Sequence, residues 1–109
     1  MFEFVLPLDH LRSIKHDVGW GNGYVAIPMD HPLAGKHYDE IHELCDIQVH
    51  GGLTYSNLGI IGQPEYTEGM WIVGFDCAHL GDNPSTCPKE YVENQAKILR
   101  KQLERYERR

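Results

Sequence analysis

The chain has 109 residues, of which 41% are hydrophobic and 24% charged, the balance of one domain with a single core. No apolar run approaches the roughly 20 residues that cross a bilayer, and the opening MFEFVLPLDHL lacks the basic cluster typical of a secretory signal, so we expect one cytoplasmic domain over residues 1–109 that does not bind membranes. The net charge of −6 disfavours broad nucleic-acid binding, and three cysteines are too few for a disulfide framework, so we expect free thiols.

The first part of the chain predicts short elements separated by glycine and proline. Three-residue spacing of apolar side chains favours a short helix within Leu6–His16. The segment GWGNG allows a tight turn, and the β-prone stretch that follows it is ended by Pro28, which predicts a strand at Tyr24–Ile27. A second short helix is predicted at Tyr38–Leu44, because side chains of similar character recur there at helical intervals.

The middle of the chain predicts two further strands. Apolar and polar residues alternate from Ile47 to Ser56, which indicates a strand with His50 and Thr54 on its polar face. The loop NLGIIGQPEYTEG then leads to Met70–Cys77, the most apolar strand of the chain.

The last segment predicts a long helix that begins near Pro88, a residue suited to a first helical turn. Its apolar seam consists of Val92, Ala96, Leu99, Leu103 and Tyr106. Strands followed by a helix, without regular βαβ alternation, predict an α+β fold in which a small, mainly antiparallel β-sheet of three to four strands packs against this C-terminal amphipathic helix. The seam is wider than such a sheet covers, so we expect a homodimer through the helix or a sheet edge.

Side chains that can do chemistry gather where the most apolar strand ends, in WIVGFDCAHLGD. In extended geometry Cys77 points to one face and is expected in the core beneath the helix, whereas Asp76 points to the other. A carboxylate on an apolar strand needs a partner, and we expect Asp76 to pair with His50 on a neighbouring strand. This pair either fixes the strand end or orients an imidazole that works as a base or ligand.

The loop after this strand adds His79 and Asp82. Together with His50 they could form a site for a divalent metal such as zinc, whereas the simpler interpretation is a turn capped by Asp82 with no cofactor. Gly51 and Gly52 of HGGLTYS would let backbone or ligand approach the sheet closely. The remaining histidines match no zinc signature and are expected in solvent: His31, His37 and His42.

The segments GYVAIPMDHPLAGKHYDEI, VHGGLTYS and WIVGFDCAHLGD, followed by an amphipathic helix, resemble a family of small, largely uncharacterised proteins encoded by tailed bacteriophages and prophages. The resemblance spans Gly23–Asp82 and the helix. It implies a phage origin and an accessory protein that binds or blocks a component of the infected bacterial host cell.

Two functions remain open. In the first, the chain is a non-catalytic counter-defence protein that sequesters a host nucleotide signal or blocks a host defence protein, with a ligand-binding surface made of His50, Gly51, Gly52, Thr54, Trp71, Asp76, His79 and Asp82. In the second, it is a small hydrolase in which a divalent metal that activates water is held by His50, Asp76, His79 and Asp82. The first is favoured, because the sequence shows no nucleophile motif, phosphate loop or complete ligand set.

Overall fold

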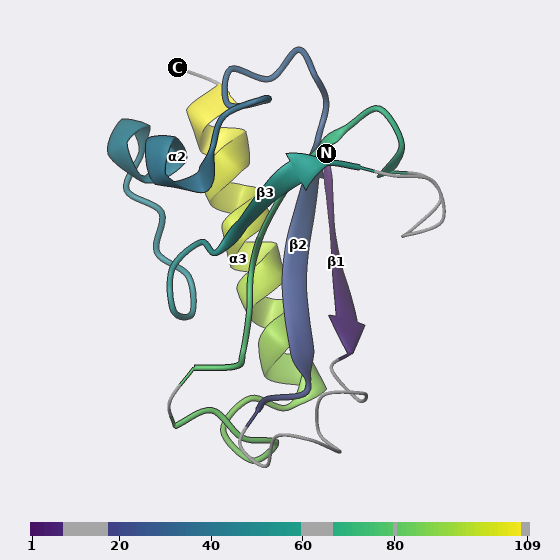
Figure 1. The fold of residues 1–109 in the computed structure, drawn as a ribbon, viewed down its shortest axis with the longest axis vertical. Coiled ribbons are helices and arrows are strands. Elements are labelled where there is room, and N and C mark those ends of the chain that lie inside the picture. Colours follow the sequence, from purple (N-terminus) through teal and green to yellow (C-terminus); the bar gives the residue numbers. More distant parts are fainter. Residues whose placement is uncertain (8–17, 60–66, 80, 108–109) are drawn as a thin grey trace.

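The chain folds into a four-stranded antiparallel sheet with one long helix packed along it (Figure 1). The computed structural model describes residues 1–7, 18–59, 67–79 and 81–107. The strands are β1 (Phe2–Pro7), β2 (Gly21–Ile27), β3 (Tyr55–Leu58) and β4 (Trp71–Phe75), and the helices are α2 (Tyr38–Leu44) and α3 (Lys89–Glu107). All neighbours in the order β1-β2-β4-β3 are antiparallel. The α+β fold predicted from the sequence is confirmed.

Helix α3 covers one face of the sheet with the apolar seam that the sequence predicted. A fully buried Val, Leu, Ile or Phe side chain contributes about 1.5–3 kcal/mol by leaving water. Gly23 makes room for this packing, because a Cβ there would lie 2.4 Å from the Phe75 ring and 3.2 Å from the Cβ of Ala96. The buried residues shared by the sheet and the helix are Val25, Ile27, Val73, Phe75, Val92, Ala96, Leu99 and Leu103.

The other face of the sheet carries a row of aromatic side chains. Phe4 pairs with Tyr24 in the sheet register, and Gly74 pairs with both Tyr24 and Tyr55. The Phe4 and Tyr24 rings stack with their centroids 5.2 Å apart, and Tyr24 meets Tyr55 edge-on at 5.6 Å. A Cβ on Gly74 would lie 2.4 Å from Cδ1 of Tyr24. The glycine therefore lets the Tyr24 ring lie over β4.

Helix α2 has the bounds that the sequence predicted. The imidazole of His37 caps the helix by accepting the Asp39 N–H at 3.2 Å. The buried side chain of Ile41 packs the helix against the core. The segment that follows is joined to α3, since the Gln48 N–H donates to Oε1 of Gln102 at 2.8 Å. Helix α2 thus lies near the C-terminal part of α3 (Figure 1). Neither of the two helices described has the length and apolar character that crossing a membrane requires.

The strand predicted from Ile47 to Ser56 is largely wrong, because only Tyr55–Leu58 pairs with β4. Gly51 and Gly52 have φ values of 67° and 77°, and this left-handed backbone turns the chain and interrupts an extended segment. Apolar side chains on either side of the turn still face the core, including Ile47 at 5% exposure. The alternation of apolar and polar residues therefore reflects the packing of an irregular segment. His50 lies in a turn of this segment.

The N-terminal prediction also differs from the structure. Phe2–Pro7 forms β1 at the edge of the sheet, where a proline without an N–H is tolerated. The helix predicted within Leu6–His16 is therefore wrong at its first two residues, and positions 8–16 lie outside the described residues.

Two histidines that we expected in solvent are structural. His31 is 3% exposed; its Nδ1 accepts the Leu33 N–H at 3.0 Å, and its Nε2 lies 3.0 Å from the Leu103 carbonyl oxygen. His42 is half-buried and accepts the Leu53 N–H at 3.0 Å. Both imidazoles satisfy backbone groups of irregular segments, which sequence spacing does not reveal.

Candidate metal centre

Four side chains able to bind a metal converge between the end of β4 and the start of α3: His50, Cys77, Asp82 and Cys87. One ligand atom from each lies within 4.8 Å of the others. The set, called the ligand cluster below, joins the turn before β3, the segment after β4 and the residues just before α3. Three members are buried, with exposures of 0% for Cys77, 1% for Cys87 and 6% for Asp82, and His50 is half-buried.

The spacing of the ligand cluster approaches that of a tetrahedral ion. Nε2 of His50 lies 2.9 and 3.1 Å from the two Asp82 oxygens and 3.8 Å from Sγ of Cys87. Sγ of Cys87 lies 3.6 Å from Oδ1 of Asp82. A zinc ion with bonds of about 2.0–2.3 Å separates its ligand atoms by about 3.3–3.8 Å. If Nε2 of His50 and the Asp82 oxygens moved apart by a few tenths of an ångström, their spacing would match that of ligands on such an ion.

Neighbouring groups orient the ligand cluster. The Tyr91 hydroxyl lies 2.9 Å from Nδ1 of His50, and Oε1 of Gln95 accepts the His50 backbone N–H at 2.9 Å. Oδ2 of Asp82 accepts the backbone N–H of His79 at 2.9 Å. In metal sites a partner on the second ring nitrogen sets the tautomer of the ligating imidazole. With a metal bound at Nε2, the ring proton of His50 would lie on Nδ1 and donate to the Tyr91 hydroxyl.

Gly19 and Trp20 hold the two cysteines of the cluster side by side. The Gly19 N–H donates to the Cys77 carbonyl at 2.6 Å, and the Trp20 N–H donates to the Cys87 carbonyl at 2.8 Å. A Cβ on Gly19 would lie 2.7 Å from the Cβ of Cys77 and 2.6 Å from the Cβ of Cys87. A residue without a side chain is therefore required between them.

The electrostatics of the cluster leave a place for positive charge. Burial raises the pKa of the Cys77 thiol far above its usual range, and the adjacent Cys87 adds to this rise. Burial also raises the pKa of the Cys87 thiol. Burial alone would raise the pKa of the Asp82 carboxyl, but hydrogen bonds from the His79 amide and from His50 lower it below its usual range. A divalent cation bound to both sulfurs would lower their pKa values and hold them as thiolates.

The same geometry is unsuited to a cysteine nucleophile. In a nucleophilic pair the imidazole takes the thiol proton at one nitrogen and is oriented through the other. Here Cys87 and Asp82 both approach Nε2 of His50, while Nδ1 faces Tyr91. A buried thiol with a raised pKa is also the opposite of a reactive thiolate. The arrangement can bind a metal more readily than it can attack a substrate.

The structure gives His50 a different carboxylate partner from the predicted one. His50 pairs with Asp82, whereas Oδ1 of Asp76 accepts the Ala78 N–H at 3.1 Å and lies 3.1 Å from Nδ1 of His79. The prediction of a His50–Asp76 pair assumed two neighbouring strands. It is wrong because His50 lies in a turn and Asp76 follows β4.

His79 lies at the rim of the ligand cluster. Its ring centroid is 6.0 Å from that of His50, and it packs so closely on Gly51 that a Cβ there would be 2.5 Å from Cε1 of the imidazole. Nδ1 of His79 is buried 3.1 Å from Asp76 and 3.5 Å from Asp82, but neither contact has hydrogen-bond geometry. This nitrogen is the one cluster-facing polar atom left without a hydrogen bond in the described part of the chain.

The other residues predicted for the site lie outside the cluster. Gly52 contributes the second positive φ of the turn, and the Thr54 N–H donates to a β4 carbonyl at 2.9 Å. The Trp71 indole N–H donates to the Lys36 carbonyl at 3.0 Å. These three residues contribute to the backbone geometry and hydrogen bonds of the fold.

Sequence reasoning missed Cys87 and Tyr91 and gave Cys77 only a packing role. The burial predicted for Cys77 is correct, but its sulfur also belongs to the ligand cluster. A signal was present in DCAHLGDNPSTC, which places two cysteines, a histidine and two aspartates in one short segment. Assuming regular strand geometry through this segment hid the convergence.

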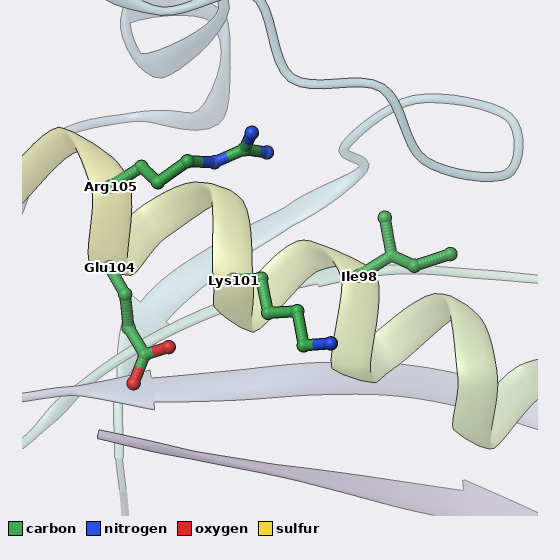
Figure 2. Close-up of a pocket in the computed structure, with 4 residues that line it drawn as sticks. All are labelled: Ile98, Lys101, Glu104 and Arg105. Carbon is green, nitrogen blue, oxygen red and sulfur yellow. The ribbon is translucent and has the colours of Figure 1, made fainter.

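A separate hollow of about 420 Å³ lies on the outer side of α3. Figure 2 shows Ile98 and Arg105 projecting to one side of the helix and Lys101 and Glu104 to the other. The lining comes from a single helix and mixes both charges around one apolar side chain. We assign no chemistry to it.

Comparisons of the chain with protein-family models, with curated proteins and with solved structures find no match. The resemblance to phage proteins therefore stays a prediction from the motifs.

Proposed function

We propose that this protein binds one zinc ion through His50, Cys77, Asp82 and Cys87, and that the zinc-stabilised domain is a non-catalytic binding module. The observation that carries the proposal is the convergence of these side chains, from three separate segments, on one buried point.

The donor set selects among metals. Two sulfurs, one imidazole nitrogen and one carboxylate oxygen suit zinc, whereas magnesium and calcium prefer oxygen ligands alone. The contacts from Tyr91, Gln95 and the His79 amide supply the oriented surroundings typical of metal ligands.

The number of ligands indicates what the ion does. Four protein ligands close a tetrahedral zinc and leave no position for water, as in structural sites. The ion would tie the turn at His50 to the segment after β4 and to the start of α3, and so stabilise the loop around His79. The phage-like motifs make a host protein or a small nucleotide-like ligand the expected partner of this loop surface.

A hydrolase remains the second candidate. Of the four residues predicted for it, Asp76 lies beside His79, with 3.1 Å between Oδ1 and Nδ1, and the metal ligands would be His50, His79 and Asp82, with a position open for a metal-bound water. The buried Nδ1 of His79, 3.5 Å from Oδ2 of Asp82 and without a hydrogen bond, favours this set. It leaves Cys87, 3.8 Å from Nε2 of His50, unused beside the ion, which is why we prefer the set with two sulfurs.

Zinc content tests the proposal and separates the two candidates. Elemental analysis and native mass spectrometry of protein purified without added metal should find one zinc per chain in the wild type. Cys87→Ala should lose the ion. His79→Ala should keep it. Cys45→Ala is the matched control, because this cysteine lies outside the cluster, with its Sγ donating to the Ile41 carbonyl at 3.4 Å.

The outcomes are decisive in both directions. Zinc lost in His79→Ala and kept in Cys87→Ala would replace our ligand set with that of the hydrolase. A folded wild-type protein that contains no zinc and takes none up from solution would refute the proposed function.

A further inference from the structure

We propose that the zinc centre is a thiol redox switch, in which a peroxide joins Cys77 and Cys87 in a disulfide and releases the ion. The inference rests on the proposed zinc site and states what that site responds to.

The two cysteines are placed for such a bond. Both Cβ atoms lie within 2.7 Å of the point where Gly19 would carry its own Cβ, and both sulfurs belong to the ligand cluster. Disulfides need Cβ atoms about 3.5–4.5 Å apart, a separation that this shared approach to Gly19 permits. The hydrogen bonds from Gly19 and Trp20 to the two cysteine carbonyls hold the backbones in register. The two sulfurs, which lie within 4.8 Å of each other, are therefore placed to join.

Zinc makes these sulfurs reactive. A cysteine that ligates zinc does so as the thiolate, which is the nucleophilic form of the sulfur. The remaining cysteine, Cys45, lies at the end of α2 and outside the cluster. The reaction therefore has a defined pair of participants.

The chemistry balances with hydrogen peroxide as the oxidant. One thiolate attacks a peroxide oxygen, so that an S–O bond forms, the O–O bond breaks and hydroxide leaves. The second thiolate attacks the resulting sulfenic sulfur, so that the S–S bond forms and the S–O bond breaks. Two protons from solvent convert the two hydroxide equivalents to water. The peroxide gains two electrons, and the two cysteines lose them.

Access and release follow from the positions of the ligands. Sγ of Cys87 lies 3.8 Å from Nε2 of His50, whose side chain is 20% exposed, so the route proposed for peroxide is past this imidazole. Oxidation removes two of the four ligands, and His50 and Asp82 alone hold zinc weakly. The disulfide keeps the segment after β4 joined to the start of α3, so the core under α3 is preserved. A dithiol reductant then restores the site.

The test uses zinc-loaded, full-length wild type. Zinc is quantified first. Peroxide is then added at a dose shown in a separate control to oxidise dithiothreitol fully, and the released zinc is followed with a chromophoric chelator. We expect release of one zinc per chain, a peptide that links Cys77 to Cys87, and recovery of zinc binding after dithiothreitol and fresh zinc. Cys45→Ala should behave as the wild type.

The redox inference and the zinc proposal fail in different ways. Protein without zinc before peroxide is added refutes the proposed function and the switch with it. Zinc retained after peroxide, or cysteines converted to sulfinic acid without a disulfide, overturns the switch and leaves zinc binding in place.

Discussion

Zinc binding to this protein should release two protons per ion near neutral pH. Cys77 and Cys87 both carry raised pKa values in the metal-free protein, so both bind zinc only after losing a proton. The pKa of Asp82 is lowered, so its carboxyl is already ionised and contributes no proton. The expected count therefore depends directly on both sulfurs being ligands.

The size of the effect follows from this proton count. Each released proton makes zinc affinity rise tenfold per pH unit, so two protons give about a hundredfold, or about 2.7 kcal/mol per pH unit. The sign is that affinity increases with pH, and the stability that zinc adds falls as the solution is acidified. A zinc site made only of His50, His79 and Asp82 contains no thiol, so it would release no thiol protons.

Titration calorimetry and chelator competition both measure the count. The binding enthalpy is compared in two buffers of different ionisation enthalpy, and the affinity is followed between about pH 7 and pH 8, a range in which ordinary thiols remain largely protonated. A slope near two supports both sulfur ligands, and Cys45→Ala should leave it unchanged. A slope near zero would refute the reasoning, and a slope near one would remove one cysteine from the ligand set.

Three further predictions address the groups around the site. In metal-free protein the lowered pKa of Asp82 adds stability to the folded state. This stability is present above the ordinary carboxyl pKa of about 3.9 and is lost as pH falls through the lower pKa of the folded state. Thermal melts of Asp82→Asn should lack this acid-induced loss. His31→Ala should destabilise the fold by about 2–4 kcal/mol in urea unfolding, because it removes the hydrogen bonds to the Leu33 N–H and the Leu103 carbonyl, and a change below about 1 kcal/mol would contradict this account. Gly51→Ala should destabilise the fold more than the matched control Gly35→Ala. Both residues have positive φ, but only a Cβ at position 51 would clash with the His79 ring. Equal urea midpoints for the two variants would contradict the close packing.

The sequence by itself determined the elements that depend on local periodicity. Helix α2 has its predicted bounds, and the seam of α3 is buried from Val92 to Leu103, because helical spacing places those side chains on one face whatever they pack against. The apolar run of β4 and its burial beneath α3 followed in the same way. Edge strand β1 was missed, since a short strand with four half-buried residues followed by two exposed ones has no clear alternation.

The candidate site was decided by the tertiary structure. His50 meets Asp82, Cys87 and Tyr91 across 32, 37 and 41 positions of the chain, and no local pattern specifies which of the available carboxylates or thiols an imidazole will reach. Two left-handed glycines turn His50 out of the predicted strand, and the backbone N–H groups of Gly19 and Trp20 hold the two cysteines side by side. The residue types alone predicted polar side chains at the end of the strand. The directions of those side chains depend on loop geometry and on contacts between distant segments, which exist only in the folded chain.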